Sequence, residues 1–191
     1  TAGAAATFGQ FFNGCLFRCA GSLFLSMYGT FAQAFTRNVC ICTTAGNSAK
    51  ISTDSSETGG DVNRPTMFAN NVFVGFNGGL WFKGDNGPSG LWLNNIFASA
   101  ALGVVLGADL RDNTDHALLF LGNRYYAVTT PFSAYLDSLN EHMAPWYGFT
   151  EVVSDPFVDA ANGDYRVTQA SGLIDTALPM YDSQGVPLCV D

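Results

Sequence analysis

A pattern of hydrophobic and polar residues recurs along the chain, and in its clearest part the offset is 24 residues. The segment Met67-Phe-Ala-Asn-Asn-Val-Phe-Val74 is matched by Leu91-Trp-Leu-Asn-Asn-Ile-Phe-Ala98. The same offset aligns Gly79-Leu-Trp-Phe-Lys-Gly-Asp85 with Gly103-Val-Val-Leu-Gly-Ala-Asp109. Because two separate segments repeat in step, the pattern predicts a solenoid whose coils stack on one another.

The repeated frame predicts two columns of residues across the coils. The first column holds an asparagine in each coil: Asn13, Asn38, Asn71, Asn95 and Asn123. The second column lies two residues later: Cys15, Cys40, Phe73, Phe97 and Tyr125. Since alternate residues of a strand share one face, we expect the second column to point into the core. Amide side chains stacked ~4.8 Å apart can bond to one another, so the first column predicts an asparagine ladder.

These columns predict an all-β fold, a solenoid of about five stacked coils. A β-sandwich or jelly roll would also give short strands, but it does not predict two separate segments that repeat at the same offset of 24 residues. Leu136, Leu139 and Met143 have helical spacing, so we expect a short helix within 133–143, in a C-terminal insertion spanning 128–150. We divide the chain into an apolar first-coil and docking segment (1–36), the coils with their loops (37–150), and a closing coil with its tail (151–191).

Charge is distributed unevenly. The chain is 48% hydrophobic and 13% charged, which excludes global disorder, and its net charge of −8 argues against a general nucleic-acid binder. Residues 1–50 carry Arg18, Arg37 and Lys50 and no acidic residue, so all 16 acidic residues lie beyond them. The first quarter is either buried core or a surface that also docks onto a larger partner, with Phe8, Phe11 and Phe12 as candidate docking residues.

The five cysteines do not form a recognisable metal motif. Their spacings and the distant histidines argue against zinc, and an odd number argues against a disulfide framework. We expect Cys15, Cys40 and Cys42 to be buried, reduced and free of metal. Trp81, Trp92 and Trp146 are candidates to stack on sugars, and Trp81 and Trp92 are equally candidates to face a neighbouring subunit. No segment is a convincing transmembrane helix.

The C-terminal region carries three short motifs: Asp155-Pro-Phe-Val-Asp159, Asn162-Gly-Asp-Tyr-Arg-Val167 and Ser171-Gly-Leu-Ile-Asp175. Together they resemble the closing segment of right-handed parallel β-helix proteins of the pectate-lyase-like superfamily. The first motif is one residue shorter than is usual there, and Gly172 replaces the usual proline. The resemblance implies that the solenoid is a right-handed parallel β-helix and that this segment terminates it. We expect Leu173 and Ile174 to cover the open end of the core.

The resemblance also implies a possible catalytic chemistry. Many members act on polysaccharides with acidic calcium ligands and a basic residue on one face of the coils. The matching candidates here form a weak acidic site: Asp85, Asp109, Arg111, Asp112 and Asp115. The alternative is a solvated acidic turn. No lysine or arginine maps onto a lyase base, and no nucleophile-elbow motif is present.

Two main functions therefore stay open, beside an adhesin or another kind of surface protein. The first is a non-catalytic structural or interaction module, a homo-oligomer (a trimer is expected) without cofactors, anchored by its N-terminus to a larger assembly. Phage virion proteins of the tail or capsid surface use short β-helices of this kind, so the expected location is extracellular or on a virion surface. The second is a carbohydrate-active β-helix, a lyase or hydrolase or the C-terminal fragment of one, for which calcium and a polysaccharide are the expected ligands.

Overall fold

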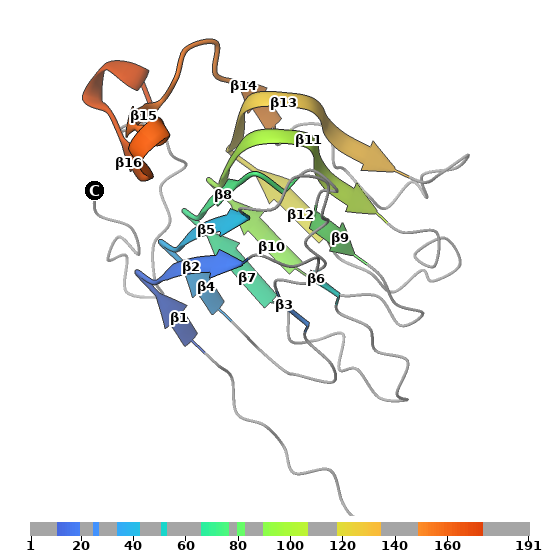
Figure 1. Cartoon of the computed structure of the whole chain (residues 1–191). Coiled ribbons are helices and arrows are strands. Elements are labelled where there is room, and N and C mark those ends of the chain that lie inside the picture. The colour runs from blue at the N-terminus through green and yellow to red at the C-terminus, as the bar shows by residue number, and fades with distance from the viewer. Residues whose placement is uncertain are drawn as a thin grey trace, which may run out of the picture.

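Parallel strands stacked in register dominate the chain. The computed structural model describes residues 11–19, 25–26, 34–42, 51–52, 66–76, 80–82, 90–106, 118–134 and 149–173. Within these ranges there are strands, corners and two short 3-10 helices, and no α-helix. The predicted all-β parallel β-helix is confirmed, since each coil contributes strands to two parallel sheets (Figure 1).

The first sheet, here called sheet A, takes one strand from each of five successive coils. Its order is β1 (Phe11–Asn13), β4 (Ala34–Thr36), β7 (Thr66–Ala69), β10 (Gly90–Leu93) and β12 (Leu118–Leu121). The second sheet, sheet B, also takes its strands from successive coils. Listed from the last coil to the first, its order is β14 (Phe149–Glu151), β13 (Asn123–Ala134), β11 (Ile96–Leu106), β8 (Val72–Val74), β5 (Val39–Cys42) and β2 (Leu16–Cys19).

A third side of the coils is formed by shorter pieces. Strand β9 (Leu80–Phe82) pairs with the second half of β11, whose own second half pairs with that of β13. Strand β3 (Leu25–Ser26) pairs with β6 (Ile51–Ser52), which lies next to β9. The long β11 and β13 pass from sheet B to this side by bending at Ser99 and Ala127, where φ is 53° and 51°.

The corner between the two sheets fixes the register of the first coil. At each of the five described corners between sheet A and sheet B, a residue with positive φ precedes the inward corner position: Gly14, Arg37, Asn70, Asn94 and Gly122. In the first coil that residue is Gly14, so the corner position is Cys15, and Asn13 pairs with Thr36 instead. The predicted column was therefore wrong by two residues in this coil. Phe17, and not Cys15, is the register partner of Cys40.

The interior is an aromatic stack supplied mainly by sheet A. Successive inward rings lie almost parallel, with centroids 4.8 Å apart for Phe12 and Phe35, 5.1 Å for Phe35 and Phe68, and 4.0 Å for Phe68 and Trp92. From sheet B, Phe73 stacks on Phe97 at 5.4 Å. Trp92 is 0% exposed, so the expectation that it contacts sugars or a subunit is wrong, because the residue belongs to this core.

The C-terminal segment lies against the side of the β-helix. It consists of β15 (Phe157–Asp159), the 3-10 helix η3 (Ala160–Asn162), β16 (Asp164–Val167) and η4 (Gln169–Ser171). Phe157 is buried against the outer face of sheet B, in one cluster with Ile41, Val72, Val74, Ile96 and Ala98, and Leu173 packs against the same cluster. Figure 1 shows this segment in orange beside β5 and β8.

This placement corrects the expectation that Leu173 covers the open end of the core. The physical reason is that sheet B is apolar on both faces, so its outer face needs a cover as much as its end does. Ile174 lies outside the described residues.

Other expectations are met only in part. Ser133 and Ala134 belong to β13, so no helix begins at Ser133, and the remainder of 133–143 lies outside the described residues. The boundary drawn after residue 150 divides β14. Cys40 and Cys42 are buried and form no disulfide, whereas Cys15, which also forms none, is only half-buried. In the described part of the chain, no helix has the length and hydropathy needed to cross a membrane.

Candidate docking end of the β-helix

An asparagine ladder locks each corner to its neighbours. Asn38, Asn71, Asn95 and Asn123 are at most 1% exposed. The backbone N–H and side-chain Nδ2 of Asn71 both donate to Oδ1 of Asn95, at 3.0 and 2.9 Å, and Asn95 donates in the same way to Asn123, at 3.0 Å for both bonds. Each Nδ2 also donates to the carbonyl of an inward aromatic residue, as from Asn95 to Phe68 at 2.9 Å. The ladder therefore joins the corners directly to the aromatic stack.

Within the described residues, the ladder ends in the first coil. Asn38 donates through Nδ2 to the Phe12 carbonyl at 3.1 Å, and its Oδ1 accepts from the backbone N–H of Cys15 at 2.9 Å. Cys15 occupies the position that asparagine holds in the next coils, but its thiol lacks the amide oxygen that accepts the two bonds of each ladder step. An adjacent coil could stack here through its backbone and its rings, without continuing the amide chain.

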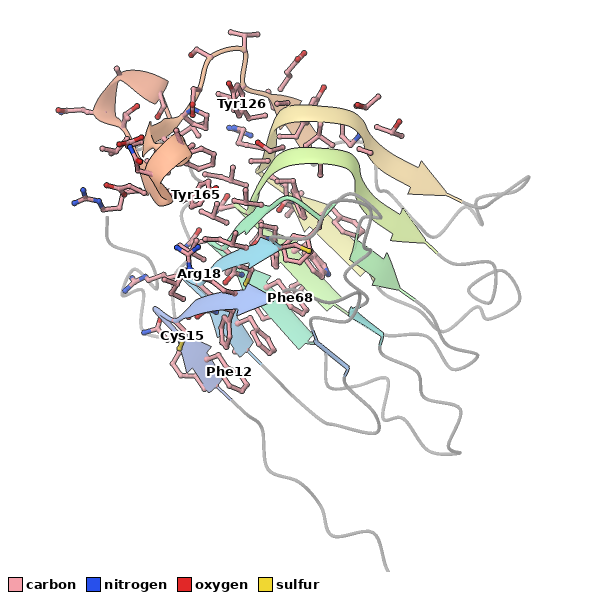
Figure 2. All side chains as sticks on the ribbon, in the orientation of Figure 1. Phe12, Cys15, Arg18, Phe68, Tyr126 and Tyr165 are labelled. Atoms are coloured by element: carbon pink, nitrogen blue, oxygen red, sulfur yellow. The ribbon has the colours of Figure 1, made fainter. Side chains whose placement is uncertain are left out.

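Apolar side chains reach the surface at this end of the β-helix. Phe11 is 66% exposed on β1, and Leu16 is 59% exposed on β2. Phe12 and Phe17 are half-buried and meet edge to face at 6.0 Å. Figure 2 shows Phe12 and Cys15 at the β1 and β2 end, with Phe68 deeper in the same stack. Because β1 and β2 end the two sheets within the described residues, strand edges and apolar side chains coincide here.

The structure separates the three docking candidates from the sequence. Phe11 is exposed at the first coil. Phe12 points into the core and stacks on Phe35, so it forms the end of the interior rather than an outward anchor. Phe8 lies outside the described residues. Leu16 was not among the candidates, although its position beside the inward Phe17 in a strand places it on the outer face.

The opposite end of sheet B carries a charged residue in the core column. Glu151 on β14 is the register partner of Tyr125, which is itself the partner of Phe97. Glu151 is exposed, and the side chain of the preceding Thr150 is exposed as well. The sequence frame stopped at Tyr125 and missed this residue. Extending the column by one further coil would have found it.

The C-terminal segment has one exposed ion pair. Arg166 contacts Asp164 through Nη2 at 2.6 Å and through Nε at 2.9 Å. The hydrogen bonds from Arg166 hold the pKa of Asp164 below its ordinary value, and Asp164 in turn raises the pKa of Arg166. Both groups are solvated, so this pair orders a local turn and does not form a reactive centre.

The acidic site suggested by the resemblance stays a prediction. Its five residues (Asp85, Asp109, Arg111, Asp112 and Asp115) all lie outside the described residues. Among the residues that the structure does describe, no group of three or more His, Cys, Asp or Glu side chains is placed to hold a metal ion.

Comparison with known proteins gives no match, whether the chain is compared with family models, curated proteins or solved structures. The fold itself therefore defines the class, a β-solenoid of two parallel sheets with a buried asparagine ladder.

Proposed function

We propose that this chain is a non-catalytic interaction module that attaches to a larger assembly through the first coil of its β-helix. The observation that carries the proposal is the position of its exposed apolar side chains. Phe11 and Leu16 flank one corner of the first coil and are 66% and 59% exposed. They lie beside the edges of β1 and β2, where a partner strand can add to a sheet.

The electrostatic pattern supports the same end. The segment 1–50 contains three basic and no acidic residues, and the acidic residues all follow it. Among the described residues, the first coil carries Arg18 and no acidic residue, whereas the C-terminal segment carries Asp155, Asp159 and Asp164. The acidic parts of two copies repel one another, which disfavours attachment through those parts. Kinship with the pectate-lyase-like superfamily and a place on a phage virion, on its tail or capsid surface, as a homotrimer are the finer parts of this proposal.

The test uses substitutions at the exposed side chains only. Phe11→Ser with Leu16→Ser removes both apolar groups and leaves Phe12 and Phe17 in the interior. We expect this double variant to keep its fold, measured by circular dichroism, and to lose co-sedimentation with the particle fraction of its source. It should also lose any self-assembly seen by analytical ultracentrifugation.

A matched control is available elsewhere on the surface. Val153 and Val158 are 90% and 50% exposed and lie in the C-terminal part of the chain. Replacing both by serine removes apolar surface without touching the first coil, so assembly should be unchanged. Equal assembly by the first-coil variant, the control variant and the wild type would overturn the proposal.

A further inference from the structure

The two ends of sheet B differ in one residue of the core column. The column runs through Phe17, Cys40, Phe73, Phe97 and Tyr125, and it ends at Glu151. Phe73 and Phe97 are each 3% exposed, so this column is the dry interior of the sheet. A carboxylate at its last position is the opposite of what continued stacking requires.

Head-to-tail stacking of two copies would bring these two ends together. Strand β2 of the next copy would follow β14 as β14 follows β13, in parallel register. Phe17 of that copy would then cover Glu151, and Leu16 would lie beside Thr150. The next residue, Arg18, would fall on the other face of the strand, so it could not pair with the carboxylate.

Covering the carboxylate in this way is unfavourable. An ionised carboxylate loses its hydration when a ring packs over it, and the few hydrogen bonds of a short strand do not replace that hydration. Charged residues that point inward at a sheet edge are a known means of preventing edge-to-edge association.

We propose that Glu151 blocks head-to-tail stacking of this chain and so reserves the first coil for a different partner. This inference rests on the proposed function, because it names what the docking end excludes. Phe11 and Leu16 supply attraction at one end, and Glu151 supplies repulsion at the other. Specific recognition commonly needs both. The β-helix can then attach at its first coil without growing into a filament.

The experiment replaces Glu151 by phenylalanine in the full chain and measures mass against concentration by light scattering after gel filtration. We expect E151F to form head-to-tail species, with about a twofold or larger rise in weight-average mass over the wild type. The matched control is T150F, which adds the same ring on the neighbouring outward position of the same strand and should keep the wild-type mass. E151Q removes the charge alone and should give an intermediate shift.

The second half of the experiment places a charge at the other end. Adding F17E to E151F should return the mass to that of the wild type, with folding checked by circular dichroism. An unchanged mass for E151F, or equal shifts for E151F and T150F, overturns the inference, and this comparison stands even where the double variant fails to fold. All arms use the purified chain alone, so they are independent of the first-coil variant and its partner. The failure of one proposal can therefore be distinguished from the failure of the other.

Discussion

Replacing Asn95 by alanine should be among the most destabilising single changes in the β-helix. Asn95 is 0% exposed and lies in the middle of the ladder. Alanine removes the two bonds that Oδ1 accepts from Asn71, at 3.0 and 2.9 Å, and the Nδ2 bonds to Phe68 and Asn123, at 2.9 and 3.0 Å.

The size of the effect follows from the groups left behind. The backbone N–H of Asn71 loses its side-chain acceptor, and the Phe68 carbonyl loses its side-chain donor. A buried polar group without a partner costs about 1–3 kcal/mol. Two such groups and a small cavity predict a loss of about 3–5 kcal/mol in the free energy of unfolding.

Urea denaturation measures this loss, and the same substitution at Asn13 is its control. Asn13 is exposed and accepts one bond, from the Thr36 hydroxyl at 2.9 Å. Asn13→Ala should therefore cost about 1 kcal/mol or less, with an unchanged denaturant slope. Equal destabilisation by N95A and N13A would show that the buried ladder bonds do not stabilise the fold. It would also contradict the placement of Asn13 outside the ladder.

Three further outcomes are expected. Gly75→Ala should destabilise the protein by more than about 2 kcal/mol, because φ is 77° and a Cβ would lie 2.5 Å from the Cys42 carbonyl oxygen. Gly14→Ala, where φ is 67° and no atom lies within 4 Å, is its control and should cost about 1–2 kcal/mol in urea denaturation. Phe157→Ala should release the C-terminal segment from sheet B and speed its cleavage in limited proteolysis, whereas V158A should not, because Phe157 is 5% and Val158 50% exposed. Since the folded pKa of Asp164 is lowered by Arg166, the stabilisation from this pair is present above the unfolded-state pKa and is lost as the pH falls through the folded one. R166A should raise the Asp164 titration midpoint measured by NMR, and an unchanged midpoint would contradict that cause.

The repeat was predictable because each coil of a solenoid packs only on its two neighbours along one axis. Each coil therefore needs the same residue types at the same positions, and the recurrence of asparagine at positions 71 and 95 indicates a shared column. The frame failed in the first coil because it followed asparagine rather than backbone conformation. The corner needs a residue with positive φ before the inward position, and Gly14 supplies it at no steric cost. Glycine was therefore a better marker of this corner than Asn13.

The sequence also contains evidence that the outer face of sheet B must be covered by another segment. Val72-Phe73-Val74 and Ile96-Phe97-Ala98 are continuous apolar runs, which indicate strands buried on both faces. The predicted columns contained only the inward residue of each run and assigned no packing partner to the outward residues Val72, Val74 and Ile96. Phe157 and Leu173 come from a distant part of the chain, so periodicity alone could not show that they pack there.

Function depends on the residues that break the repeat, and these are the hardest to find by searching for one. The ladder asparagines and stacked rings build coils that would continue equally well in either direction. The proposed direction of attachment and the proposed block to further stacking depend on exceptions to the repeat. Two of these are Cys15 in place of asparagine and Glu151 in place of an apolar residue. A single substitution at such a position leaves the interior coils intact and changes what the molecule can join. Under both proposals, therefore, the end coils determine the partners of this β-helix more than the regular coils do.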